Sequence, residues 1–438
     1  MLHLRNTSVS FESLILDKEL SSARAKHDPT LGCGPLLQRP QGVQRPLRQQ
    51  AFEFVRARGL AARADITHAL GISAGSVTTI AADLIASGYL REVERQARET
   101  GRGRPKVALE VVPEAALTIG VKLSFKRHTA VLTDFAGHVI ADVALSSSEA
   151  RRPAVQLISE TEALIAKLLA DAGKTHADIQ GVGIGLPGII DHRTGRVVWS
   201  PLLQERDAHL SVSLTRKLGL TVSLDNDANM LTLAELWFGQ GRALSDFAVV
   251  TIESGVGMGM VLDNQLYRGA HGMGLELGHT KVQLDGALCQ CGQRGCLEAY
   301  LADYALVREA SAALGRGFDL DKSPKEVLAL LFEHAKAGHQ GAEAIFRRAG
   351  HFLSLGLSNV VQLFDPELII LSGERMQYEH FYVDEVLKNM RQLTLNEGRK
   401  PCAVAVTAWD DLVWARGASA LALFTMTDRL IGGEMRAA

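Results

Sequence analysis

The spacing of apolar residues changes near residue 46, where an irregular start gives way to a long patterned remainder. Residues 1–42 show no sustained period and end in a segment rich in glycine and proline, so we expect a flexible N-terminal extension. From Pro46 onward, apolar residues recur at helical spacing and predict three short helices, the third over residues 74–87. Gly71 begins the turn before this third helix. Two helices joined by a glycine-containing turn predict a helix-turn-helix.

Two strand patterns follow, over residues 89–93 and 107–112, and the segment RQARETGRGRPK joins them. This segment carries five basic residues and one acid, and a basic hairpin behind a helix-turn-helix is typical of a wing that enters the DNA minor groove. We therefore expect residues 43–112 to form a winged helix-turn-helix that binds double-stranded DNA. A helical bundle with a solvated charge run is the alternative. The predicted DNA contacts are Ser76, Thr78, Thr79, Arg102, Arg104 and Lys106.

Strand and helix patterns alternate after residue 113. Three successive strand patterns, a helix over residues 153–172 and a strand over residues 179–186 give the order β-β-β-α-β. This is the order of an actin-like, ribonuclease-H-like lobe, and it predicts the α/β class. We place this first lobe at residues 113–240.

Composition and charge separate the two parts further. With 438 residues the chain is long enough for two or three domains, and its net charge of -2 means that any DNA-binding surface must be local. Residues 41–110 hold 11 lysines and arginines against 7 aspartates and glutamates, a balance of +4 that leaves -6 for the rest. The chain has no apolar stretch of membrane-spanning length and no apolar N-terminal run. We therefore expect a cytoplasmic protein without membrane insertion.

Cysteines gather in one polar, glycine-rich segment, CQCGQRGC, and a histidine precedes it by ten residues. Three thiolates and one imidazole complete a tetrahedral structural zinc site and leave no open position for a catalytic water. Gly292 and Gly295 would allow the tight bend that brings the sulfurs together. Reduced, buried cysteines are the alternative, although this segment is a poor core strand. The predicted zinc ligands are His279, Cys289, Cys291 and Cys296.

Carboxylates lie on both sides of this cluster. Glu276 precedes it and Glu298 follows it, so folding around the ion would bring both together as acceptors for a hydroxyl-rich ligand. A second polar group, DNDAN, follows a strand pattern over residues 220–224 and opens a helix. Asn226 and Asp227 would therefore lie at the carboxyl end of a strand, where α/β proteins usually bind ligands. Helix N-capping is the alternative, although it needs only one such residue.

The motif ExGH followed by CxCGxxGCxE resembles the signature of the ROK family, named for repressors, open reading frames and kinases. The resemblance covers most of the chain from about residue 45 and implies a two-lobed, sugar-kinase-like body. A second lobe would then occupy residues 241–438 and contain the zinc site and the C-terminal helices. GRGRP resembles the wing of ROK repressors, and the chain resembles the xylose, N-acetylglucosamine and glucose types of these repressors.

The resemblance weakens at the phosphate-binding motifs. ROK kinases carry DxGGTK between their first two strands, whereas this chain has GVKLSFKRH. Lys122 replaces the aspartate that organises magnesium, and Ser124 and Phe125 stand near the glycines. The second glycine loop, ESGVGMG, has Glu253 where kinases have glycine, and Glu374 departs from the family's NPxxIxxGG. We therefore expect the protein not to be an enzyme.

The sugar half of the cleft keeps the family's residues. Asp227 matches the general base of the kinases, although we expect no catalytic residue here. His279 would serve twice, with one ring nitrogen on zinc and the other near the ligand. The ligand site implied by the resemblance comprises Gly188, Asn226, Asp227, Glu276, His279 and Glu298.

Together these features predict a sugar-responsive transcriptional regulator, in the family's commoner mode a repressor, that senses a sugar or sugar derivative without phosphorylating it. Its expected partners are a DNA operator, the sugar and further copies of the chain in a homodimer or homotetramer, because a two-fold DNA site needs at least two heads. Two alternatives stay open. One is an active sugar kinase with a DNA-binding head, and the other is a regulator controlled by a protein partner.

Overall fold

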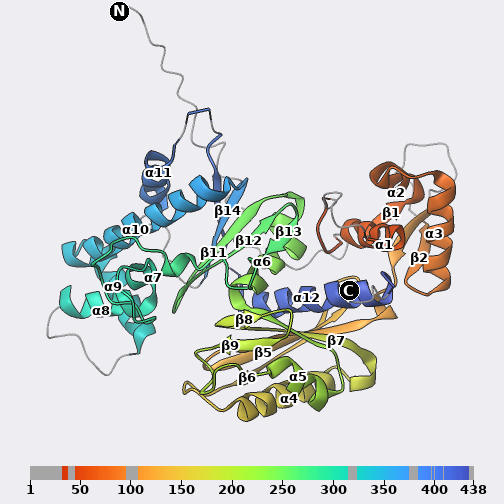
Figure 1. Ribbon diagram of the computed structural model, residues 1–438, viewed down its shortest axis with the longest axis horizontal. Helices are drawn as coiled ribbons and strands as arrows, with labels where there is room; N and C mark the ends of the chain where they lie inside the picture. Colours follow the sequence, from red (N-terminus) through yellow and green to blue (C-terminus); the bar gives the residue numbers. More distant parts are fainter. Residues whose placement is uncertain are drawn as a thin grey trace, which may run out of the picture.

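The computed structural model shows a small helical head beside a body of two lobes (Figure 1). Each lobe is built on a five-stranded sheet, so the expected two-lobed α/β architecture is confirmed. The structure describes residues 32–37, 45–94, 107–313, 323–373, 383–395, 397–398, 400–407 and 409–433.

Three helices and a three-stranded antiparallel sheet of order β1-β3-β2 form the head, which is the arrangement of a winged helix-turn-helix. The side chain of Ser73 accepts a hydrogen bond from the Ser76 backbone N–H and begins the third helix, as an N-cap does. The segment that joins β2 to β3, with Arg102, Arg104 and Lys106, lies outside the described residues. The elements are α1 (Leu47–Arg58), β1 (Leu60–Ala62), α2 (Arg63–Leu70), α3 (Ala74–Ala86), β2 (Leu90–Glu94) and β3 (Val107–Val111).

The first lobe has the strand order β10-β7-β4-β5-β6. Strand β4 lies at its centre, antiparallel to β5 and parallel to β7, and β5 pairs with β6 in antiparallel fashion. Helix α4 packs its leucine-rich face on the sheet and shares one apolar core with it. The elements are β4 (Leu117–Lys122), β5 (Arg127–Asp134), β6 (Val139–Ser146), α4 (Ala154–Asp171), β7 (Ile179–Leu186), β8 (Ile189–Asp191), β9 (Arg196–Trp199), α5 (Leu210–Leu218) and β10 (Val222–Asn226).

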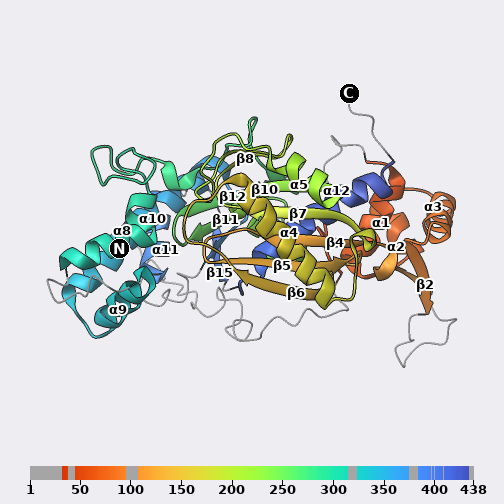
Figure 2. The same ribbon diagram turned by 90° about the horizontal axis from the view of Figure 1, so that it is seen from below.

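The second lobe repeats this topology. Its order, β13-β12-β11-β14-β15, places the first strand of the lobe at the centre, antiparallel to β12 and parallel to β14. A group of helices extends from this lobe on the side away from the head (Figures 1 and 2). The elements are β11 (Phe247–Ile252), β12 (Val256–Leu262), β13 (Gln265–Tyr267), α7 (Glu298–Leu301), α8 (Asp303–Ala313), α9 (Pro324–Lys336), α10 (Gln340–Phe364), β14 (Leu368–Ser372), α11 (Val383–Leu393) and β15 (Ala403–Thr407).

Helix α6 (Asp227–Phe238) joins the lobes and packs on both. It starts at the end of β10 and lies close to β12. A Cβ on Gly259 would lie 2.1 Å from the Thr232 hydroxyl oxygen and 3.0 Å from the Ala228 carbonyl oxygen of the helix. One of the glycines in ESGVGMG is therefore explained by helix packing.

Helix α12 (Val413–Leu430) corrects the expected domain boundary. It follows β15 and was expected in the second lobe, but it lies against β4 and β7 of the first lobe (Figure 1). The reason is backbone contact, because a Cβ on Gly120 or Gly183 would lie 2.0 or 1.9 Å from a carbonyl oxygen of α12. α6 and α12 thus form a helical layer between the two sheets.

The head is seated on this layer. The ring of Phe52 lies 4.7 Å from that of Phe135 at the end of β5, and the guanidinium of Arg56 donates to the Thr427 hydroxyl of α12 at 2.8 Å. One apolar core continues from the head through α6 and α12 into the body. The head and the body therefore pack as one unit.

Part of the expected flexible extension is bound in this seam. Residues 32–37 lie between head and body, and the side chain of Cys33 is fully buried there. Backbone hydrogen bonds to both sides explain the difference, because glycine-rich sequence has no period from which such order could be predicted. The rest of residues 1–42 lies outside the described residues.

Within the described ranges, no single helix is both long and apolar enough to cross a membrane. Only the α2 and α3 pair passes that test together, and it is bent by 119° at the helix-turn-helix turn.

Candidate functional site

Four potential metal ligands converge in the loop between β13 and α7. One ligand atom from each of the four residues lies within 4.8 Å of all the others. The sulfurs of Cys291 and Cys296 are 3.7 Å apart, and Cys289 Sγ is 3.7 Å from His279 Nδ1. A tetrahedral ion with metal–sulfur bonds of about 2.3 Å would need edges of roughly 3.6 to 3.8 Å. The cluster of His279, Cys289, Cys291 and Cys296 could therefore hold a metal ion.

Two residues that the sequence analysis missed support this cluster. Lys281 Nζ lies 3.0 Å from Cys296 Sγ, where its charge would offset the excess negative charge of three thiolates around a divalent ion. The Tyr300 hydroxyl accepts from the Ala287 N–H at 2.8 Å and fixes the loop above the cluster. Gly292 and Gly295 have φ values of 87° and 75°, as the predicted bend requires.

Glu298 lies beside the cluster, and its charge and that of Asp227 act on Glu276. Glu298 is buried, and its Oε2 accepts from the Val256 N–H at 3.2 Å while its Oε1 lies 3.4 Å from Cys289 Sγ. Partial loss of solvent raises the pKa of Glu276, even though its side chain keeps an exposed face. The charge of His279 opposes this rise, and the charges of Asp227 and Glu298 add to it. The structure thus brings together four of the six expected ligand-site residues.

Asp227 lies in the first turn of α6, close enough to Glu276 for its charge to act on that carboxyl group. Burial raises the pKa of its carboxyl group, and the positive charge of Lys122 opposes that rise. One carboxylate oxygen accepts from the Ala228 N–H at 3.0 Å. A carboxyl group held this way at a helix start can accept a hydrogen bond from a ligand hydroxyl.

Asn226 has a capping role. Its side-chain oxygen accepts from the Asn229 N–H at 2.8 Å and caps α6. Helix N-capping, the alternative to ligand binding for DNDAN, therefore applies to this residue. The buried Asp225 accepts from the Arg268 Nε at 2.6 Å and from the Asn229 amide at 2.7 Å. Arg268 was not expected, since the hydrophobic pattern shows no link between it and β10. It ties the loop after β13 to the first lobe.

Gly188 lies where backbone geometry demands glycine. Its φ is 127°, and a Cβ there would lie 2.2 Å from the Trp199 carbonyl oxygen. The residue therefore allows β8 and β9 to pair closely, and a ligand could meet only its backbone.

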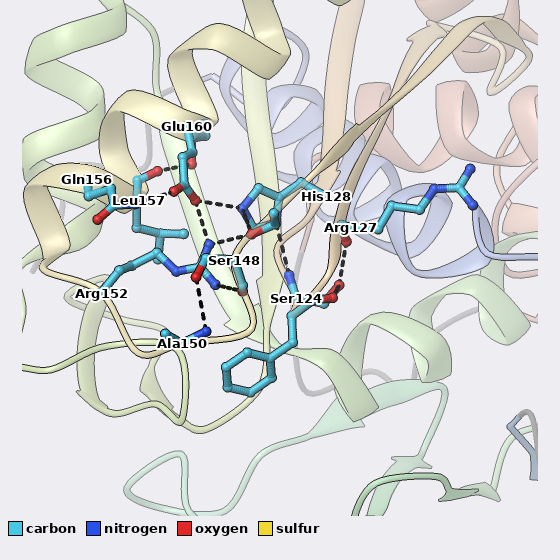
Figure 3. Close-up of polar contacts among 12 residues, drawn as sticks. Ser124, Arg127, His128, Ser148, Ala150, Arg152, Gln156, Leu157 and Glu160 are labelled. Carbon is cyan, nitrogen blue, oxygen red and sulfur yellow. Dashed lines mark hydrogen bonds and ion pairs between the residues drawn. The ribbon is translucent and has the colours of Figure 1, made fainter. Parts of the chain in front are cut away.

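The first turn of the first lobe is occupied by its own polar groups (Figure 3). The Ser124 N–H donates to His128 Nδ1 at 3.2 Å, and the Ser124 hydroxyl donates to the Arg127 carbonyl oxygen at 2.5 Å. The Leu123 N–H donates to the Gly185 carbonyl oxygen at 2.8 Å. These backbone donors of the turn are thus already paired within the protein.

A buried network fixes this turn from behind (Figure 3). His128 is 1% exposed, and its Nε2 lies 3.0 Å from the Glu160 carboxylate, which also accepts from Arg152 at 2.6 Å. Burial lowers the pKa of His128. Burial alone would raise the pKa of Glu160, but the hydrogen bonds from His128 and Arg152 outweigh it and lower this pKa. Because Nδ1 accepts from the Ser124 N–H, the proton of the imidazole lies on Nε2, which donates to Glu160.

Lys122 points across to α12. Its Nζ lies 3.4 Å from the centre of the Trp414 ring, a cation–π contact. The side chain therefore places a cation at the entrance of the turn, at the position that matches the aspartate of the ROK kinase motif. Glu253 also stands at the end of β11, and its backbone N–H donates to the Gly255 carbonyl oxygen at 2.9 Å.

The exposed face of α3 carries the three predicted base-contacting side chains, Ser76, Thr78 and Thr79. Four arginines of the described head are paired with acids of the head and are therefore partly neutralised. The pairs are Arg45 with Glu53, Arg48 with Asp83, Arg63 with Glu92, and Arg91 with Glu110. The α3 face is thus small and polar, which suits close approach to base edges.

Comparison with known proteins assigns the family. The ROK family profile matches residues 118–424, which is most of the chain, and the two-lobed fold agrees with it. A xylose repressor of Caldicellulosiruptor bescii is 27% identical over 337 residues, which cover 75% of this chain and 83% of that repressor. Two solved structures extend the likeness to three dimensions.

A ROK family transcriptional regulator, a homologue of the E. coli MLC protein, has a TM-score of 0.73 at 22% identity and covers 87% of this chain and 96% of its own. A ROK family glucokinase from Streptomyces griseus, in complex with glucose and AMPPNP, has a TM-score of 0.59 at 29% identity and covers 70% of this chain and 99% of its own. The regulator covers a larger share of this chain than the kinase does, and the difference is about the length of the head. On this evidence the chain belongs to the ROK family.

Proposed function

We propose that this protein is a DNA-binding transcriptional repressor whose kinase-like body binds a sugar or sugar derivative without phosphorylating it. One combination of features carries the proposal. A winged helix-turn-helix packs on a ROK body that keeps neighbouring carboxylates at Asp227, Glu276 and Glu298, while backbone donors of the turn matching the kinase phosphate loop are paired within the protein. The likeness to a xylose repressor supports the same function.

The sugar would bind between Asp227, Glu276 and Glu298, with His279 beside them and the backbone of Gly188 at the edge. Carboxylates at fixed positions accept hydrogen bonds from vicinal hydroxyls, and each such bond to a charged group contributes about 1.5 to 3 kcal/mol. Asn226 would contribute through its amide nitrogen, because its oxygen caps α6. Binding would draw the lobes together, since the carboxylates come from both lobes.

Phosphoryl transfer is disfavoured by three observations. The backbone donors of Leu123 and Ser124 are already paired, so they are not free to cradle a phosphate. Lys122 supplies a cation where a magnesium-organising anion would be needed. Glu253 adds a negative charge to the second glycine loop. Asp227 would consequently accept a hydrogen bond from a sugar hydroxyl, and it would not act as the general base of a phosphoryl transfer.

Zn²⁺ is the metal best suited to the cluster. Three sulfurs and one imidazole nitrogen at tetrahedral spacing are the ligand set of structural zinc, and four protein ligands leave no open position. His279 would bind through Nδ1, which faces the sulfurs, and the ion would orient the histidine and the adjacent Glu298. The ion would therefore hold the sugar-binding groups in place without taking part in chemistry.

DNA would be contacted by Ser76, Thr78 and Thr79 of α3 in the major groove and by Arg102, Arg104 and Lys106 of the wing in the minor groove. A helix-turn-helix protein that reads a two-fold site needs at least two heads, so we propose a homodimer or homotetramer. Sugar binding would change DNA affinity to the extent that the two lobe arrangements differ in their affinity for each ligand.

The test first selects the DNA sequence that the protein binds and then measures whether a sugar releases the protein from it. The purified protein is incubated with randomised duplexes, the bound fraction is sequenced, and the affinity for the selected duplex is measured by fluorescence anisotropy with D-xylose, D-glucose and further sugars. We expect a selected sequence and at least one sugar that weakens binding by about fivefold or more. Binding without sequence preference would contradict the proposal.

A further inference from the structure

Residues 32–37, here called the strap, contact the head, the layer between the lobes and both lobes. Gly32, Cys33 and Gly34 are buried, whereas Leu37 at the other end is 41% exposed. The strap has neither helix nor strand, so the hydrogen bonds that it makes with other elements hold it in place.

The first attachment is to the head. The Cys33 N–H donates to the Arg56 carbonyl oxygen at 3.0 Å, at the end of α1. The contact is so close that a Cβ on Gly32 would lie 2.1 Å from the same oxygen and 2.3 Å from the Gly59 nitrogen. Only glycine can therefore occupy position 32 while the strap is docked.

The second attachment is to the layer between the lobes. The Gly34 N–H donates to the Trp237 carbonyl oxygen of α6 at 2.9 Å, and the Leu36 N–H donates to the Arg242 carbonyl oxygen at 2.7 Å. The Arg242 guanidinium returns one hydrogen bond to Gly34 and another to the Ala57 carbonyl oxygen of the head. Arg242 thus fastens strap and head together.

The third attachment reaches both lobes. On the first lobe, the sulfur of Cys33 packs against Gly137 in the turn between β5 and β6, where a Cβ would lie 2.2 Å from it. On the second lobe, the Asn264 amide donates to the Leu37 carbonyl oxygen at 2.6 Å. Asn264 lies in the turn between β12 and β13 and is 2% exposed.

We propose that the strap is the mechanical link through which the position of the second lobe is transmitted to the DNA-binding head. The head itself rests on Phe135 of the first lobe and on α12, whereas the strap adds a connection to the turn between β12 and β13. A shift of the second lobe relative to the first moves Asn264 relative to Gly137 and pulls on the end of α1. The regulatory role of the strap rests on the proposed sugar response, whereas the structural link between the second lobe and the head needs no ligand.

Cys33 provides the readout, since its thiol is buried while the strap is docked. The rate of its alkylation by iodoacetamide, followed by mass spectrometry of the full-length protein, measures strap release. Amide hydrogen exchange of the Arg56–Gly59 turn, measured in parallel, reports whether the head responds.

The decisive variant is Asn264→Gly, which removes the second-lobe attachment. Asn264 has a φ of 57°, so glycine keeps the backbone of this turn. We expect at least fivefold faster alkylation of Cys33 and faster exchange at the end of α1. Asp263→Gly is the matched control, because Asp263 is exposed in the same turn with a φ of 50° and should leave both rates unchanged.

Gly32→Ala tests the docked position directly. Its methyl group would collide with the head backbone, so alkylation should accelerate more than tenfold, whereas Gly181→Ala, whose methyl group meets nothing closer than 3.8 Å, should behave as wild type. Unchanged Cys33 alkylation and α1 exchange in both Asn264→Gly and Gly32→Ala would overturn the proposal. These rates are measured without sugar or DNA, so they test the link even if the proposed function fails.

In the sugar arm, D-xylose and D-glucose are added to wild type and Asn264→Gly, and binding is followed by thermal shift and by anisotropy of the selected duplex. We expect Asn264→Gly to keep its thermal shift but to lose at least two thirds of the sugar-induced change in DNA affinity. A full sugar-induced change in this variant would overturn the transmitting role. If neither sugar affects wild type, the proposed function fails for these sugars, and the alkylation and exchange rates decide the link.

Discussion

Among single residues, the four potential metal ligands should contribute most to holding the proposed sugar site in place. Cys291→Ser removes one of four converging ligands, and we expect the zinc content of purified protein to fall from about one ion per chain to near zero. We expect the free energy of unfolding to fall by at least about 2 kcal/mol, which would lower the melting temperature by roughly 4 to 8 °C for a lobe of this size. Emission spectrometry and thermal unfolding measure the two effects.

Cys402→Ser is the matched control for this variant. Cys402 lies outside the cluster and forms no disulfide, so its substitution should leave the zinc content unchanged. Equal zinc content in Cys291→Ser and wild type would show that the four side chains are not the metal site.

Asp227 is the residue on which sugar binding should depend most. Asp227→Asn keeps the size of the side chain but removes the charge, and we expect sugar affinity to fall by about 10- to 100-fold, the equivalent of one hydrogen bond to a charged group. Affinity for DNA without sugar should stay within about twofold of wild type, because α3 and the wing are unchanged. Isothermal titration with the sugar found by screening measures the first quantity.

Asp171→Asn, at the exposed end of α4, is the control for an aspartate outside the cleft. If Asp227→Asn lost DNA binding and kept its sugar affinity, the assignment of the ligand site would be wrong.

At the level of whole elements, the β5–α4 network predicts a pH dependence. Burial lowers the pKa of His128 below its unfolded value of about 6.5, so the unfolded chain takes up a proton before the folded protein does. Stability contributed by the neutral imidazole is therefore present above pH 6.5 and is lost as the pH falls below it, by up to about 1.4 kcal/mol per pH unit. The groups that face this imidazole are Glu160, Arg152, Ser147 and the Ser124 N–H.

Urea unfolding of wild type and His128→Gln at pH 7.0 and pH 5.5 measures this effect. We expect the loss of stability between the two values to be about 1 kcal/mol smaller in His128→Gln, because glutamine does not titrate. His176→Gln, at an exposed position, should retain the wild-type dependence. An identical pH dependence in His128→Gln and wild type would refute the neutral, buried state of this histidine.

The wing is the element whose charge should dominate DNA affinity, since four arginines of the described head are already paired with acids. Arg104→Ala should weaken binding to the selected duplex by roughly tenfold and reduce the slope of log K against log salt by about 1. Arg127→Ala removes a charge from the body, where it pairs with Asp411, and should change neither quantity. Salt titrations of both variants provide the comparison. A wild-type slope in Arg104→Ala would place the wing away from the phosphates.

Across the whole molecule, local pattern explains which parts were predictable. The leucines of α4 face one core and repeat at helical spacing, so the helix could be placed to within a residue at its start. The first-lobe strands β4, β5, β6, β7 and β10 could likewise be placed from their own apolar patterns, whereas the second lobe was expected from the family resemblance. The metal-ligand cluster could be proposed because its sulfurs are close in sequence, so that spacing alone constrains their geometry.

The parts that could not be predicted depend on contacts between residues far apart in the chain. The strap is ordered by hydrogen bonds to Arg56, Trp237 and Asn264, which no local pattern links to residues 32–37. The return of α12 to the first lobe depends on two glycines in different strands. Lys281 and Arg268 are ordinary surface charges in the sequence and acquire partners only in the fold.

The proposed function requires a kinase-like body that binds sugar but no longer transfers phosphate. Thermal unfolding of the zinc-containing protein tests this requirement, with each sugar of a panel, with and without ATP and magnesium, followed by an assay of ADP for every sugar that binds. We predict a sugar-dependent rise in melting temperature that ATP does not alter, and no ADP above the sugar-free level. A rise that requires ATP, with ADP formed in proportion to sugar, would instead identify a sugar kinase that carries a DNA-binding head.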